Sequence, residues 1–293
     1  MARPRRWHVH LGAHKTATTQ IQDSLVLNRS ALAGHGVGVV SRADIRSVNF
    51  PIGKAFHRFF PGVGMQIRRH MGDRGAGQPT VVLSEELILG LAPEMLLSPM
   101  YPNAAERLRP LARLARKEPV SFFLGVRGHD SIFPSCYAQA LRARAYPPGH
   151  FDVIRQQLQQ QPPSWMELAR RLSQALGGAQ LTVWTMEAYK ENPQRILSEL
   201  TGVDGLELAE VTSNILSPSA EAVAEVENTC ADLVRQERQE AVARIYTDLS
   251  PGHPKFAPFT AEEVSALKQA YQQDLEQMAA AGFIQLLKGQ KDG

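Results

Sequence analysis

The segment at residues 8–24 constrains the fold of this chain more than any other part, because it changes from strand to helix within a few residues. Residues 8–11 are a short apolar stretch, typical of a buried strand. Gly12 and a polar loop with Lys15 follow, and then a helical pattern begins. A strand, a tight loop and a helix start leave free backbone N–H groups at the positive end of the helix dipole. This arrangement binds phosphate-like anions.

The side chains of this loop suit an anion as well. Lys15 adds a full positive charge, and Thr16, Thr18 and Thr19 add hydroxyl groups. The Walker A motif of nucleotide triphosphatases needs a glycine directly before the lysine, but this chain has His14 there. The usual triphosphate loop is therefore a poor fit.

The loop resembles the 5′-phosphosulfate loop of sulfotransferases that use 3′-phosphoadenosine 5′-phosphosulfate. In the bacterial carbohydrate-type branch, that loop has the approximate pattern H-x-G-x-x-K-T-G-T-T-x-x-Q. The matching residues here are His10, Gly12, Lys15, Thr16, Thr18, Thr19 and Gln22. Ala17 stands where the family usually has glycine, which reaches positive φ freely. We therefore expect either an ordinary φ at Ala17 or a loop that differs slightly from the family's.

A second segment, further along the chain, strengthens the resemblance. Residues 120–126 are rich in β-formers and uncharged, which predicts a strand buried on both faces. Arg127 follows directly, and a helix is predicted to begin near residues 130–131, which are good N-cap residues and would leave Pro134 in its first turn. Sulfotransferases hold the 3′-phosphate of the cofactor with an arginine after such a strand and a serine eight residues later. The resemblance assigns these roles to Arg127 and Ser135, and a guanidinium fork suits phosphate.

Three residues are candidates for the base that would take a proton from the acceptor. A strand predicted to end near residue 84 leads into Glu85 and Glu86. Carbohydrate-type sulfotransferases use a glutamate from a comparable place, which by register is Glu86, with Glu85 second. Adjacent side chains on an extended segment point opposite ways, so only one should face the cofactor; either could instead be a helix N-terminal acid. His14 is the third candidate, with shaping of the loop as its alternative role.

Strand and helix patterns alternate along the chain. Strands are predicted at residues 7–11, 36–40, 80–83, 120–126 and 181–185. Helices are predicted at residues 18–32, 103–116, 131–144, 165–176 and 193–200. This alternation indicates a P-loop-like three-layer α/β/α fold, with a central parallel sheet between helices. Ligands in such folds bind at the carboxyl ends of the strands, where Lys15 and Arg127 both lie.

All 293 residues are predicted to form one sulfotransferase domain with a helical C-terminal part at residues 219–293. Residues 260–263 match a capping box that opens the last helix. The stretch at residues 213–218 and the pair Tyr271 and Asp274 resemble the tail of the same bacterial sulfotransferases. The resemblance therefore extends over nearly the whole chain.

Two stretches are predicted to be irregular. Arg42–Gly77 mixes glycine and proline with phenylalanine and arginine, and Tyr146–Pro163 combines prolines with a run of glutamines. Long loops in a compact domain are usually functional, so we expect both to frame the acceptor pocket; the alternative is that they are peripheral and touch no ligand. The aromatic residues of the first stretch could stack on a sugar ring or belong to the core.

Composition limits the class of protein. Apolar residues make up 43% of the chain and the net charge is +3, which suits an anionic ligand but is too mild to indicate nucleic acid as a partner. The two cysteines, Cys136 and Cys230, are far apart and suggest neither a disulfide framework nor a metal site. No apolar run is long enough to span a membrane. We expect a cytoplasmic protein.

The function expected from the resemblance is transfer of a sulfuryl group from 3′-phosphoadenosine 5′-phosphosulfate to an acceptor hydroxyl on a sugar, glycan or glycolipid. Adenosine 3′,5′-bisphosphate would be the other product, and no metal would be required. Two alternatives stay open. A P-loop kinase-like enzyme would use Lys15 and a Mg²⁺-binding carboxylate such as Glu85 or Glu86, but would leave Arg127 and Ser135 without a role. A non-catalytic nucleotide-binding protein would keep the cradle and lack the base.

Overall fold

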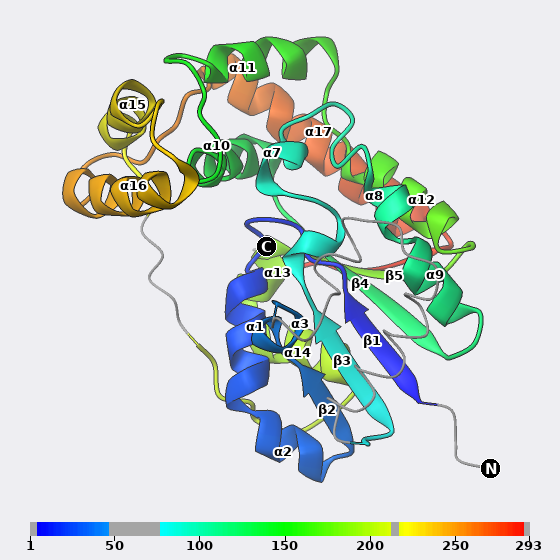
Figure 1. Ribbon diagram of the computed structural model, residues 1–293. Coiled ribbons are helices and arrows are strands. Elements are labelled where there is room, and N and C mark those ends of the chain that lie inside the picture. The colour runs from blue at the N-terminus through cyan, green and yellow to red at the C-terminus, as the bar shows by residue number, and fades with distance from the viewer. Residues whose placement is uncertain (1–4, 47–76, 212–216, 290–293) are drawn as a thin grey trace.

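A parallel sheet forms the centre of the computed structural model, which describes residues 5–46, 77–211 and 217–289 (Figure 1). Among these residues six strands pair in the order β2-β3-β1-β4-β5-β6, and every pairing is parallel. The strands are β1 (Arg6–His10), β2 (Val37–Val40), β3 (Thr80–Ser84), β4 (Val120–Val126), β5 (Leu181–Thr185) and β6 (Ile284–Leu287). After β1, the chain places β2 and β3 on one side of it. It then places β4, β5 and β6 on the other side. The direction of winding therefore switches at β1.

Side chains of successive strand residues enter two different cores. In β3, Val81 and Leu83 belong to the larger core and Val82 belongs to the smaller one. In β4, Phe122 and Phe123 divide in the same way. Because side chains alternate along a strand, each face of an uncharged strand supplies one core. The expected three-layer α/β/α architecture is confirmed.

Helices cover both faces of the sheet (Figure 1). The smaller core is closed by α1 (Thr18–Leu27), α2 (Arg29–Gly34), α13 (Met186–Glu191) and α14 (Pro193–Thr201). The larger core is closed by α8 (Ala104–Arg107), α9 (Arg109–Ala115), α12 (Trp165–Ala175) and α17 (Ala261–Ala280). Beyond the carboxyl ends of the strands lie α7 (Ala92–Met95), α10 (His129–Ala140), α11 (Phe151–Gln160), α15 (Ala220–Thr229) and α16 (Arg235–Leu249). Of the helices in these described ranges, none is both long and apolar enough to cross a bilayer.

Two predicted helices differ in detail from the observed ones. The helix expected at 18–32 is interrupted at Asn28, whose side-chain amide donates to the carbonyls of Ser24 and Ala209 and thereby satisfies backbone groups from two elements. The helix expected near residues 130–131 begins earlier, at His129, so Pro134 lies in its second turn and not in the first. Proline there removes one N–H donor from the helix interior.

The stretch Tyr146–Pro163 is not an irregular loop. It contains α11, whose buried residues Phe151, Ile154 and Leu158 follow helical spacing. The stretch Arg42–Gly77 begins with the short helix α3 (Arg42–Arg46), and residues 47–76, with the phenylalanines expected near an acceptor, lie outside the described residues.

Candidate functional site

The residues that follow β3, β1 and β4 meet at one edge of the sheet. These strands are neighbours, and Glu86, Lys15 and Arg127 come shortly after their carboxyl ends. Since the chain changes its direction of winding at β1, this edge is the topological switch point, where open α/β folds bind ligands. A cavity of about 590 Å³ lies there. Its lining residues are Lys15, Ala17, Thr18, Thr19, Gln20, Glu86, Arg127, Ser135, Ala138, Gln139, Arg142, Met186, Ser217, Pro218 and Tyr246.

The loop between β1 and α1 has left-handed backbone at three positions. Gly12 has a φ of 60°, Lys15 of 65° and Ala17 of 62°. Thr16 stands between the last two and has a negative φ, and alternation of this kind turns successive N–H groups toward one concavity, which binds anions. The expectation of an ordinary φ at Ala17 is wrong: the alanine adopts the conformation that the family's glycine would favour, at a steric cost.

The three loop threonines are placed differently. The hydroxyls of Thr16 and Thr18 both donate to the Ala13 carbonyl, at 2.8 and 3.0 Å. Thr16 is buried beneath the loop and does not line the cavity, whereas Thr18 and Thr19 do. Thr16 therefore holds the loop closed, and Thr18 must turn its hydroxyl proton away from Ala13 to donate to a ligand.

Lys15 is a largely desolvated cation in this cavity. Burial lowers the pKa of its ammonium group, and the positive charges of Arg142 and Arg127 lower it further. The carboxylate of Glu86 opposes this shift. A buried cation among other cations is stabilised by a bound anion, which is the property expected of a phosphate site.

Glu85 and Glu86 point to different places, as expected for neighbours at a strand end. The Glu85 side chain is buried and accepts a hydrogen bond from the Leu87 N–H at 3.0 Å, so it caps the short 3₁₀ helix η2 (Glu86–Ile88). Glu86 lines the cavity with Lys15. Glu85 is thus the N-cap of η2, and Glu86, in the first turn of η2, is the glutamate that faces the cavity.

His14 is fixed below the loop. Its ring Nδ1 lies 2.8 Å from the Tyr101 hydroxyl, and its backbone N–H donates to the same oxygen at 3.0 Å. Because that hydroxyl accepts from the N–H, its own proton is available to Nδ1. His14 is 1% exposed and is absent from the cavity lining. Its position favours the loop-shaping role.

Cys136 is buried, and its thiol donates a long hydrogen bond to the loop. Its Sγ is 3.9 Å from the His14 carbonyl oxygen, and burial raises the pKa of the thiol to about 12. It is a small, fully buried side chain.

Arg127 connects β4, α10 and the loop. Its Nε donates to the Ser131 hydroxyl at 2.9 Å and its Nη1 donates to the Lys15 carbonyl at 3.2 Å, while its own carbonyl accepts from the Trp165 indole. Burial lowers the pKa of the guanidinium. Ser135, two turns into α10, donates to the Ser131 carbonyl and faces the same cavity. The expected pair, Arg127 and Ser135, is therefore brought together.

Several lining residues were not expected from the sequence, above all Gln139, Arg142 and Tyr246. Ser135, Gln139 and Arg142 are separated by four and three positions, so they share one face of α10 and its last turn. Helical spacing from Ser135 could have identified Gln139 and Arg142. Tyr246 comes from α16, and nothing in the local sequence connects that helix to the loop.

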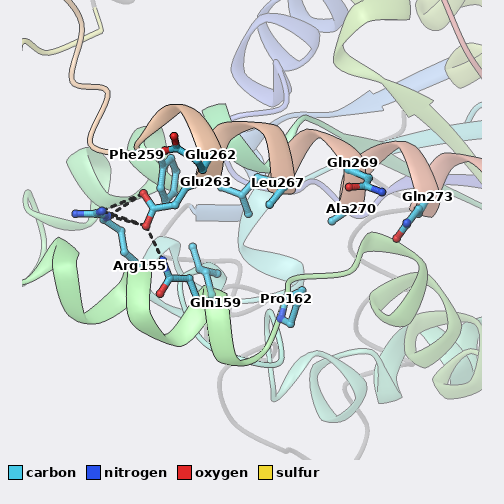
Figure 2. Close-up of a pocket in the computed structure, with 12 residues that line it drawn as sticks. Arg155, Gln159, Pro162, Phe259, Glu262, Glu263, Leu267, Gln269, Ala270 and Gln273 are labelled. Carbon is cyan, nitrogen blue, oxygen red and sulfur yellow. Dashed lines mark hydrogen bonds and ion pairs between the residues drawn. The ribbon is translucent and has the colours of Figure 1, made fainter.

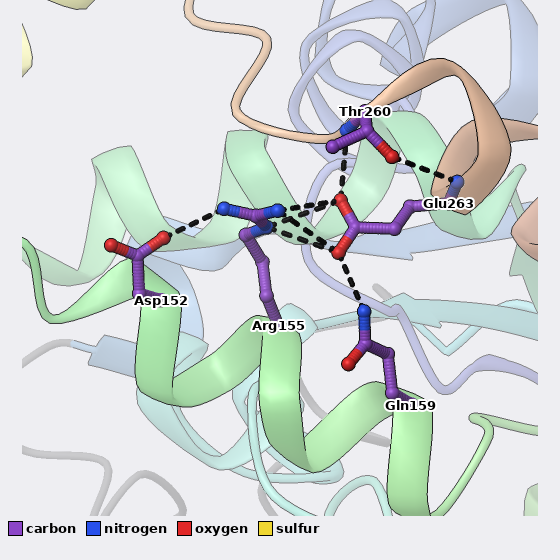
Figure 3. A network of polar contacts seen from close by, with 5 residues as sticks. All are labelled: Asp152, Arg155, Gln159, Thr260 and Glu263. Atoms are coloured by element: carbon purple, nitrogen blue, oxygen red, sulfur yellow. Dashed lines mark hydrogen bonds and ion pairs between the residues drawn. The ribbon is translucent and has the colours of Figure 1, made fainter.

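A second cavity, of about 530 Å³, lies between α11 and α17 (Figure 2). Figure 3 shows how α11 is fastened there: Arg155 and Gln159 donate to the Glu263 carboxylate, which also accepts from the Thr260 N–H, and Arg155 pairs with Asp152. None of the described residues of the stretch 146–163 lines the Lys15 cavity. That this stretch frames the acceptor pocket stays a prediction.

Comparison of the chain with models of protein families, with curated proteins and with solved structures finds no match. In the residues that the structure describes, no group of three or more His, Cys, Asp or Glu side chains could hold a metal ion.

Proposed function

We propose that this chain transfers a sulfuryl group from 3′-phosphoadenosine 5′-phosphosulfate to an acceptor hydroxyl. The observation that supports this proposal best is the meeting of Lys15, Glu86 and Arg127 in one cavity at the switch point of the sheet. A cavity of about 590 Å³ is within the range that ligand sites of about 300–1,000 Å³ occupy. Its charged lining is three cations, Lys15, Arg127 and Arg142, and one carboxylate, Glu86, so it suits a ligand with several negative charges.

Glu86, Lys15 and Arg127 each have one task in this reaction. Glu86 takes the proton of the acceptor hydroxyl, whose oxygen forms a bond to sulfur. The bond between sulfur and the 5′-phosphate oxygen breaks, and its electron pair stays on that oxygen. Lys15 and the N–H groups of residues 15–19 stabilise this charge. Arg127, before α10, and Ser135, on α10, hold the 3′-phosphate and thereby fix the nucleotide in line with the acceptor.

The same cations supply the positive charge that a divalent metal supplies to kinases, so the proposed reaction needs no metal. The acceptor we propose is a hydroxyl on a sugar, glycan or glycolipid, and the compartment is the cytoplasm, where buried thiols such as Cys136 and Cys230 stay reduced.

Calorimetric titration tests the nucleotide. Adenosine 3′,5′-bisphosphate should bind the full chain in EDTA, and ATP with Mg²⁺ should bind at least tenfold more weakly. Preference for ATP with Mg²⁺, or loss of bisphosphate binding in EDTA, would instead favour a kinase-like enzyme. Bisphosphate binding without sulfate transfer to any member of a glycan and phenol panel would favour a non-catalytic nucleotide-binding protein.

A further inference from the structure

Arg142 lines the Lys15 cavity and has an aromatic partner. Its guanidinium carbon lies 5.6 Å from the centre of the Tyr246 ring, within the range of cation–π interactions. The ring is held in place because the Tyr246 hydroxyl donates to the Ala138 carbonyl at 2.9 Å. Among the described residues no carboxylate forms an ion pair with Arg142. The guanidinium is therefore positioned while its hydrogen-bond donors remain available to a ligand.

The charge of Arg142 acts on the lysine of the loop. After burial, the charge of Arg142 has the largest lowering effect on the pKa of the Lys15 ammonium, ahead of the charge of Arg127. Burial also lowers the pKa of Arg127, and the carboxylates of Asp130 and Glu187 oppose that shift. Lys15 and Arg142 line the same cavity, where like charges repel and a bound anion relieves the repulsion.

Arg127 and Arg142 lie at opposite ends of α10. Arg127 precedes α10, whereas Arg142 follows its last turn. Arg127 donates to Ser131 at the helix start, and Arg142 lies two turns beyond Ser135 on the same face. Cations that flank both ends of this helix thus line a single cavity.

We propose that Arg142, supported by the Tyr246 ring, forms with Lys15 a two-cation clamp for the 5′-phosphosulfate end of the nucleotide, separate from the 3′-phosphate site at Arg127 and Ser135. This inference rests on the proposed function. In the free protein the guanidinium lies over Tyr246; with the nucleotide bound, its N–H groups donate to the oxygens of the 5′ group, as guanidinium groups do to phosphate. Arg142 is then a residue that distinguishes nucleotides by their 5′ substituent.

The test uses adenosine 5′-phosphate and adenosine 3′-phosphate as separate probes in calorimetry. Arg142→Gln should weaken binding of the 5′-phosphate about 10- to 100-fold, the effect of one or two charged hydrogen bonds, and change the 3′-phosphate by less than about twofold. Arg127→Gln should show the opposite selectivity. Arg144→Gln is the matched control: Arg144 also lies 5.6 Å over a tyrosine ring, that of Tyr146, but it is absent from the cavity lining. It should bind both probes like the wild type.

The outcomes separate the two proposals. If the wild type binds neither monophosphate nor the bisphosphate, the proposed function fails. If the wild type binds and Arg127→Gln has the expected effect while Arg142→Gln changes nothing, only the clamp is overturned. Equal losses for both probes in Arg142→Gln would also overturn it, because a merely structural residue would affect the two phosphates alike.

Discussion

Gly12 and Glu86 are in backbone contact: a Cβ atom added at Gly12 would stand 2.7 Å from the Glu86 Cα and 3.0 Å from the Glu86 nitrogen. Gly12 does not line the cavity, although it belongs to the loop pattern. Its absent side chain lets the loop after β1 pass close to the end of β3. The glycine thus sets the distance between the lysine loop and the candidate base.

This contact predicts that Gly12→Ala destabilises the protein and displaces Glu86. A φ of 60° costs an alanine about 1–2 kcal/mol, and overpacking against backbone adds about 1–3 kcal/mol. Urea unfolding measures the sum. Gly177→Ala is the control, because Gly177 has a φ of 80° with nothing within 4 Å of an added Cβ, so it should show the strain alone. Equal losses in the two variants would mean that the close approach to Glu86 has no energetic consequence.

Glu86→Gln should leave the affinity for adenosine 3′,5′-bisphosphate nearly unchanged and lower the transfer rate by about 10²–10⁴, the usual loss for a general base. Glutamine has the same shape and cannot take the proton. Initial rates at saturating acceptor, with calorimetry of the bisphosphate, measure both quantities.

Glu85→Gln and His14→Ala are the matched variants for this test. Glu85 caps η2, so its variant should cost up to about 1 kcal/mol of stability and reduce the rate little. His14 should behave likewise, since it contacts Tyr101 and not the cavity. If Glu86→Gln keeps the full transfer rate while Glu85→Gln or His14→Ala loses it, the residue whose variant loses the rate is the base.

Ala17→Gly should stabilise the protein slightly. The left-handed φ of 62° costs alanine about 1–2 kcal/mol, whereas glycine loses about 0.5–1 kcal/mol more in unfolded-state entropy, so the free energy of unfolding should rise by up to about 1.5 kcal/mol. The denaturation midpoint measures this change. Ala13→Gly, in the same loop at a buried position with negative φ, should destabilise. A loss of stability in both variants would contradict the strain at Ala17.

How much of this site the sequence predicts depends on whether the signal is local. The Lys15 loop, the strand before Arg127 and the alternation of Glu85 and Glu86 are all encoded within a few residues, and the structure brings their expected members together. Ala17 shows the limit of such inference, because it adopts a φ that its residue type disfavours.

The remaining features depend on residues far apart in the chain. His14 is separated from the cavity by its bond to Tyr101, 87 positions away, and the break at Asn28 depends on Ala209. The helix α11 had a local signal, apolar residues at helical spacing, but its glutamines and flanking prolines resemble a loop. The strand β6 has only four residues, too few for a clear pattern.

The buried charge of Lys15 should cost the folded protein stability at neutral pH. The pKa of Lys15 is lowered from 10.5 in the folded state, so between the folded pKa and 10.5 the unfolded state binds more protons than the folded one. The contribution of Lys15 to the free energy of unfolding is therefore lowest below the folded pKa, and it rises as the pH increases toward 10.5.

Lys15→Met, which removes the charge, should be more stable than the wild type at pH 7, and the difference should shrink as the pH approaches 10.5. Urea midpoints at several pH values measure it, with the exposed Lys268→Met as control. A difference that is absent, or that grows with pH, would show that Lys15 is not a desolvated cation. The same variant should lose binding of adenosine 3′,5′-bisphosphate, so the residue that weakens the fold is the one that the proposed function needs.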